Sequence, residues 1–185
     1  EAAAQLRKNL GLDEPIWTQY VKWMGNIVQG DLGKSIATKE PVTDAIGRAL
    51  PKTLSIAALG FMIGVVIALP MGTLAALKRG SVFDYAASIS TFAGISLPTF
   101  WFGIVFILIF AVKLDWLPSV GYVPPSDGLW PWFEHLLLPG LAAGVGEAAI
   151  LMRFVRAGLL DVLGSDYIRT ARAKGLNERR VILGH

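Results

Sequence analysis

Two long stretches without a charged side chain constrain this sequence more than any other feature. They run from Thr53 to Leu77 and from Tyr85 to Val112, and they are 25 and 28 residues long. About 20 apolar residues in a helix cross the hydrocarbon core of a bilayer, so each stretch is long enough to span one. Only 17% of the 185 residues are charged, whereas a soluble domain carries about 25%. We therefore predict an all-α membrane protein rather than a soluble domain with two buried helices.

A third apolar stretch extends from Leu136 to Met152, with Glu147 as its only charged residue. With its flanks, as residues 136–160, it spans a bilayer only if Glu147, Arg153 and Arg156 face protein or water, because an ionisable group at membrane depth is costly. Glu147 either lines a polar path, pairs with Arg153 about two turns on, or lies nearer the membrane surface. The predicted spans are residues 53–77, 85–112 and 136–160.

Small residues indicate where these helices approach one another. Gly60 and Gly64 in the first span, and Gly140 and Gly144 in the third, lie four residues apart. That spacing removes side chains from one face of a helix and lets a neighbouring backbone come close.

The second span is interrupted by the polar run Ser96-Leu97-Pro98-Thr99. Such a break at membrane depth is tolerated only where protein or water covers it. Two interpretations remain open. Ser96, Pro98 and Thr99 either present polar groups to a solute path, or they form a structural kink whose hydroxyls bond back to the helix.

Residues 1–52 are mixed and polar, and we place them outside the cytoplasm. Apolar residues at helical spacing between Ile16 and Ile27 predict a short amphipathic helix, with Asp13 as a possible cap and Pro15 in its first turn. Its three aromatic residues suit a membrane–water interface. Packing on the rest of a small polar domain is the alternative.

No nucleotide, metal or nucleic-acid site is expected. The run Gly33-Lys34-Ser35 matches the last three residues of a phosphate-binding loop, but Val28 occupies the place of the required first glycine. We interpret the run as a turn. The two histidines, His135 and His185, are far apart in the sequence, and the net charge of +3 is too small to indicate nucleic acid.

The distribution of charge predicts the orientation of the spans. Short cytoplasmic loops carry an excess of Lys and Arg. Residues 78–84 hold two basic residues and one acidic residue, residues 153–185 hold seven and three, and residues 113–135 hold one and three. The turn at residues 78–84 and the tail are thus expected inside. The loop at residues 113–135 is expected outside, and we call it the aromatic loop because it contains Trp116, Tyr122, Trp130 and Trp132. Residues 1–52, with seven basic and six acidic residues, do not follow the rule.

The polar tail, residues 161–185, is predicted to form two short helices outside the bilayer. Ser165 is a possible cap for a helix that runs through Thr170 to Lys174. Gly175 is expected to end that helix in the left-handed conformation, and Asn177 to cap a second helix.

This tail resembles the cytoplasmic loop of the permease subunits of ABC importers, in the branch that transports peptides and nickel. The general signature of the family is Glu-Ala-Ala, three residues, then Gly. Aligned on Gly175, these places fall on Arg169, Thr170 and Ala171, so only the second alanine matches the general signature. The run as a whole is instead similar to the version of this loop in the peptide branch. Further runs are similar to the same branch in the same order: DYIRTARAKGL at 166–176, GDLGKS at 30–35, LPKTL at 50–54, AALKRG at 75–80, SLPTFW at 96–101 and WLP at 116–118.

The resemblance implies a type I ABC importer permease in a bacterial or archaeal inner membrane, with this chain as the middle three of six spans. It implies a second permease subunit, two cytoplasmic ATPase subunits and an extracytoplasmic solute-binding protein as partners. It implies no cofactor and no catalysis by the chain itself. The residues expected to dock on the ATPase are Tyr167, Arg169, Thr170, Ala171, Arg172, Ala173, Lys174 and Gly175.

Alternatives remain open. On its residues alone, the basic tail is equally a segment held to anionic lipid. A nickel or glutathione importer shares the motifs of the peptide branch. A secondary transporter also has broken helices, and a membrane scaffold fits the composition.

Overall fold

The computed structural model describes residues 13–177, and helices account for most of them. The chain divides into two compact units at the boundary between Thr53 and Leu54. Within the described residues, extended pairing is limited to an isolated antiparallel bridge between Lys34 and Pro41. The all-α prediction is confirmed.

In the first unit, α2 (Ile16–Val28) is the predicted amphipathic helix. Pro15 is its N-cap residue and makes no side-chain capping bond, so it precedes the first turn in which the sequence analysis placed it. Gly30 and Gly33 follow with φ of 83° and 78°, and the backbone N–H of Gly33 donates to Asp31. This segment is the turn that the sequence predicted.

The first predicted span is longer than expected. The helix α3 (Val42–Leu77) begins well before Thr53 and remains helical through Pro51 and Pro70. Its first turns carry Asp44, Arg48 and Lys52, which mark the end of the apolar part and do not end a helix. At 1.5 Å per residue, its 36 residues extend over about 54 Å, more than the roughly 30 Å of a hydrocarbon core.

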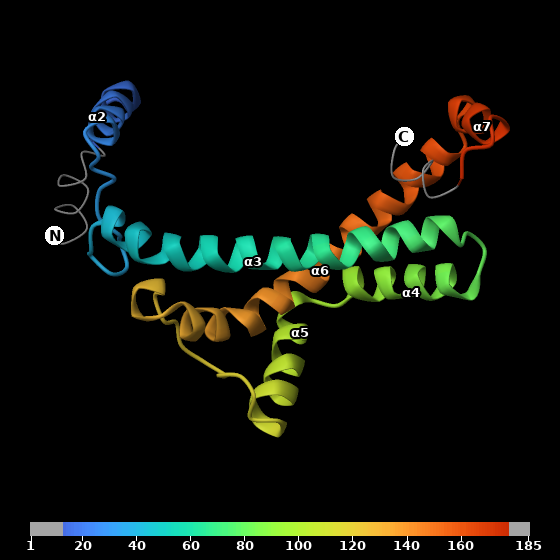
Figure 1. Ribbon diagram of the computed structural model, residues 1–185. Helices are drawn as coiled ribbons and strands as arrows, with labels where there is room; N and C mark the ends of the chain where they lie inside the picture. The colour runs from blue at the N-terminus through green and yellow to red at the C-terminus, as the bar shows by residue number, and fades with distance from the viewer. Residues whose placement is uncertain (1–12, 178–185) are drawn as a thin grey trace. The chain divides into compact units, whose positions relative to one another are not determined.

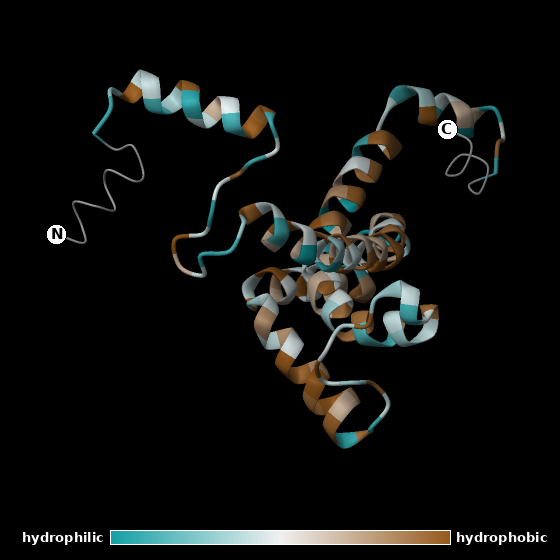
Figure 2. Cartoon of the chain, turned by 90° about the vertical axis from the view of Figure 1, so that its left-hand side faces the viewer, coloured by the Kyte–Doolittle hydropathy of each residue, from teal (hydrophilic) through white to brown (hydrophobic). Residues whose placement is uncertain are grey.

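The second predicted span is two helices. They are α4 (Val82–Ser96) and α5 (Thr99–Phe106), and a π-helix, η1 (Ile107–Lys113), continues α5. The bend at residues 97–98 is 100°. Figure 1 shows α4 folded back beside the C-terminal part of α3, while α5 turns away from α4. In Figure 2, hydrophobic residues cover α5 along most of its length. The predicted break is confirmed, and it is a sharp bend between two separate helices.

The third predicted span also starts earlier than expected. After a single 3-10 turn, η2 (Pro125–Asp127), the helix α6 runs from Leu129 to Leu163. It is followed by the short helix α7 (Asp166–Ala173). Trp130 and Trp132 therefore lie in a helix and not in the aromatic loop where the sequence placed them.

By length and composition, α3 and α6 each suffice to cross a membrane, and α4 with α5 and η1 counts as a third span if the bent pair is one. Alanines make up most of one buried cluster in the described part of the second unit. Ala68 and Ala75 of α3, Ala87 of α4 and Met152 of α6 form this cluster. The three alanines allow the helices to approach closely.

Candidate functional site

A seam of glycines joins α3 to α6. A Cβ atom on Gly60 would lie 3.0 Å from the Cβ of Ala143, and one on Gly144 would lie 2.8 Å from the carbonyl oxygen of Gly60. Gly64 faces the Cβ of Glu147 in the same way, at 3.1 Å. The prediction that the two glycine pairs permit close packing is confirmed, and the pairs pack against each other.

An ion pair holds the start of α4 against α6. The Nε and Nη2 atoms of Arg156 donate to the two carboxylate oxygens of Asp84, over 2.6 and 2.8 Å. The backbone N–H of Gly80 also donates to Asp84, at 3.0 Å. Asp84 is only 4% exposed, and a buried carboxylate needs such partners.

Local sequence explains why Asp84 is available there. Ser81 is the N-cap of α4, and its hydroxyl accepts the backbone N–H of Asp84. Asp84 therefore lies in the first turn, where the helix dipole favours a negative charge. The sequence predicted that Arg156 must face protein or water, which the structure bears out. It did not predict the partner, because the two residues are 72 positions apart.

The break between α4 and α5 exposes its polar residues. Ser96, Pro98 and Thr99 are all exposed. Within the described residues, neither hydroxyl forms a hydrogen bond, so a kink whose hydroxyls bond back to the helix is not what the structure has.

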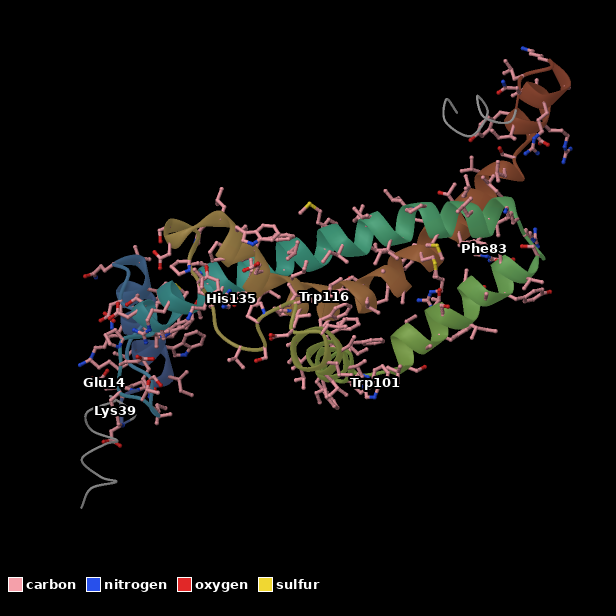
Figure 3. All side chains as sticks on the ribbon, turned by 60° about the horizontal axis from the view of Figure 1, so that its bottom comes forward. Glu14, Lys39, Phe83, Trp101, Trp116 and His135 are labelled. Atoms are coloured by element: carbon pink, nitrogen blue, oxygen red, sulfur yellow. The ribbon has the colours of Figure 1, made fainter. Side chains whose placement is uncertain are left out.

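A cavity of about 430 Å³ lies beside this break. It is lined by α3, α5, η1, the segment 118–121 and α6, and the polar residues of its lining are Thr99, Ser119 and His135. Ser96, Pro98 and Glu147 do not line it. Figure 3 labels His135 on α6, Trp101 on α5 and Trp116 in the loop after it.

Glu147 lies near the middle of α6 with an exposed side chain. Within residues 13–177, its carboxylate has no hydrogen bond or ion pair. The suggested pair with Arg153 is therefore not formed, and the guanidinium of Arg153 lies instead over the ring of Phe154, at 5.8 Å. A turn of helix is 3.6 residues, so residues six apart do not share a face.

The helix α7 ends in a Schellman motif. The backbone N–H of Leu176 donates to the carbonyl of Ala171, and that of Gly175 to the carbonyl of Arg172, the two bonds that define this ending. Gly175 has a φ of 81°, as predicted. Ser165 is the N-cap residue, but its hydroxyl donates to Val162 and makes no capping bond.

One predicted docking residue faces inward. Ala171 is 8% exposed and Ile168 is 1% exposed, and Leu163 and Leu176 pack against them. We therefore correct the expectation that Ala171 contacts a partner directly. The second tail helix, expected from Asn177 onward, lies outside the described residues. The remaining predicted docking residues are exposed: Tyr167, Arg169, Thr170, Arg172, Ala173, Lys174 and Gly175.

The structure places the predicted docking residues together, but it does not bring the predicted path residues together. The docking residues lie together on α7 and its ending turn. Of the path residues, Thr99 borders the cavity, while Glu147 lies on a different part of α6. Among the described residues, no cluster of three or more His, Asp or Glu side chains has the arrangement of a metal site.

Residues 68–185 match the family "binding-protein-dependent transport system inner membrane component", and residues 1–57 match the N-terminal family of the same membrane components.

Three relatives show similarity over nearly the whole chain. The oligopeptide transport system permease protein AppB of Bacillus subtilis (strain 168) is 39% identical over 98% of this chain and 58% of its own length. A putative peptide transport system permease protein of Brucella suis biovar 1 (strain 1330) is 39% identical over 100% and 59%. The di/tripeptide transport system permease protein DppB of Pseudomonas aeruginosa (strain UCBPP-PA14) is 36% identical over 98% and 60%. The chain therefore spans about three fifths of the length of these curated relatives.

Proposed function

Because the chain belongs to the family of binding-protein-dependent transport system inner membrane components, we propose that it forms part of the membrane path of an ATP-driven importer. The solute is a peptide. The observation that carries the proposal is the match along nearly the whole chain to relatives named for oligopeptide and di/tripeptide transport. The chain contributes the path, and a partner subunit hydrolyses ATP.

The charges of the short loops and the helices long enough to span support the proposed topology, in which the segment 1–52 is placed by the span in α3 and not by its own charge. The turn at residues 78–84 and the tail from residue 161 lie on the cytoplasmic side of the inner membrane. The loop at residues 114–128 and the segment 1–52 lie on the outer side, where an extracytoplasmic solute-binding protein delivers the peptide. A second permease subunit completes the path.

The helix α7 is the proposed contact with the ATPase. Its inner face is fixed to the end of α6 by Ile168 and Ala171, which pack against Leu163. Its exposed face presents Tyr167 and basic residues. A helix that is packed to its own chain on one face moves as a rigid body, so motion of an ATPase bound to the other face passes to α6.

The proposal is tested by uptake of a labelled dipeptide into membrane vesicles that contain the permease pair and the ATPase subunits. Uptake that requires both ATP and this chain is expected. Uptake that persists without the ATPase subunits indicates a secondary transporter and contradicts the proposal. Uptake of nickel or glutathione, with no uptake of peptides, contradicts the proposed solute alone.

Replacing Gly175 with valine is expected to abolish coupling. No atom lies within 4 Å of a Cβ built at Gly175, so the effect comes from the backbone and not from a clash. A β-branched residue in the left-handed region costs about 1–3 kcal/mol, which reduces the population of the α7 ending by about 5- to 150-fold. Peptide uptake should fall while ATP hydrolysis continues and the protein still inserts.

Gly175→Asn is the matched control, since asparagine adopts the left-handed conformation more readily. It should retain most of the uptake. Normal uptake by the Gly175→Val complex in proteoliposomes would refute the coupling role of this turn.

Replacing Glu147 with glutamine is expected to lower peptide uptake or subunit assembly by about tenfold, because an ionisable group at membrane depth is retained only where it serves a function. Glu134→Gln is the control. It makes the same change on the same helix, about 20 Å nearer the outer end at 1.5 Å per residue. If uptake and assembly are both unchanged in Glu147→Gln, Glu147 has no part in the path.

A further inference from the structure

A second, smaller cavity combines positive charge with an apolar lining. It has a volume of about 200 Å³ and lies between α3, α4 and α6. All of its lining belongs to the second unit. The residues that line it are Ala75, Ala87, Ser88, Thr91, Phe92, Met152, Arg153 and Arg156.

The two arginines of this cavity differ in their electrostatic state. Arg156 is neutralised by Asp84, which is nearly buried and which also accepts the N–H of Gly80. Arg153 has no ion pair with a carboxylate among residues 13–177, and its described contact is with the ring of Phe154. The part of α3 that borders the cavity has no charged residue, and on α6 Glu147 is not paired with Arg153. The cavity therefore keeps one uncompensated positive charge.

The two hydroxyl groups that line the cavity differ in their hydrogen bonds. Thr91 already donates its proton to the carbonyl of Ala87. The Ser88 hydroxyl has no hydrogen bond within the described residues, so it is free to donate. Arg153 and Ser88 together offer donors to one anion. The rest of the lining is methyl, phenyl and thioether surface, which gives an anion no hydrogen bond but suits an acyl chain.

We propose that this cavity binds the phosphate of an anionic phospholipid of the inner leaflet, with Arg153 as the countercharge. This rests on the orientation given under the proposed function, which places the cavity near the cytoplasmic surface. Basic pockets between membrane helices on that side suit lipid head groups. A free phosphate ion matches the charge but not the apolar lining, whereas a phospholipid matches both.

The test is lipid binding by the intact complex of permease pair and ATPase subunits, measured by native mass spectrometry. Phosphatidylglycerol should bind more tightly than phosphatidylcholine. Arg153→Gln should weaken the binding of phosphatidylglycerol by about fivefold, the effect of one basic residue near an anionic surface, and Arg153→Lys should retain most of it. Arg79→Gln is the matched control. It removes the same charge from the same side of the protein, from an exposed residue outside the cavity, and should change binding by less than about twofold.

Three results would overturn the proposal. If the Arg153→Gln complex binds phosphatidylglycerol as tightly as the wild-type complex does, the cavity holds no lipid phosphate. Equal losses in Arg153→Gln and Arg79→Gln would indicate diffuse surface charge. Displacement of the lipid by millimolar inorganic phosphate would assign the cavity to a free anion. Peptide uptake is measured separately, so a complex that binds lipid through Arg153 but transports no peptide would contradict the proposed function and leave this site standing.

Discussion

Gly144→Leu is expected to prevent α3 and α6 from packing, and to remove most of the folded protein from the membrane. At Gly144, even a Cβ atom would lie 2.8 Å from the carbonyl oxygen of Gly60 and 2.8 Å from Cγ2 of Ile63. A backbone oxygen cannot move aside as a flexible side chain can. Overpacking costs about 1–3 kcal/mol or more, which exceeds the roughly 1 kcal/mol that a helix gains when glycine is replaced.

Gly146 provides the control for this substitution. It lies two residues further along α6, and no atom lies within 4 Å of a Cβ built there. Gly146→Leu gains helix propensity without a clash in the chain, so its stability should equal or exceed that of the wild type. The measurement is the melting temperature of the detergent-solubilised protein, followed by fluorescence-detected size-exclusion chromatography. Equal melting temperatures for the two variants would disprove the close approach of α3 and α6.

Arg156→Gln should reduce both the amount of folded permease and its uptake by about tenfold, because it leaves the nearly buried Asp84 without its charge partner. Arg156→Lys keeps the charge but loses the two-pronged contact, so an intermediate result is expected.

The double variant Asp84→Asn/Arg156→Gln separates the ion pair from other effects. It leaves no unpaired charge, and the amide oxygen of asparagine can still accept the N–H of Gly80. It should therefore be less impaired than Arg156→Gln alone, a positive coupling in a double-mutant cycle. Additive losses in folded protein and in uptake would mean that the two side chains act independently.

Sequence analysis predicted well the features that depend on residues close together in the sequence. The uncharged stretch Thr53–Leu77 predicted the apolar part of α3. The apolar stretch Leu136–Met152, with Glu147 as its only charged residue, predicted the central part of α6. Pro98, with its polar neighbours, predicted the break after α4. Gly175 predicted the left-handed end of α7, because glycine is the residue that such a turn favours.

Features that depend on contacts between distant residues were missed. The pair of Asp84 with Arg156 joins positions at the ends of two different apolar stretches, and no local pattern connects them. The inward orientation of Ala171 became visible only once Leu163 and Leu176 were placed around it. The early start of α3 at Val42 was missed because charges were taken as the end of a helix, when they mark only the end of its apolar part.

We propose that α7 lies on the inner side of the membrane and contacts the ATPase. Residues 1–185 contain no cysteine, so a cysteine introduced at Ala173, on the exposed face of α7, is the only one among them that can be cross-linked. In membranes that contain the whole complex, Ala173→Cys is expected to cross-link to the ATPase subunit, and Ser119→Cys, in the loop that we propose lies outside, is not. If Ala173→Cys instead reacts with an impermeant maleimide added outside intact cells, and forms no product with the ATPase, the account is wrong.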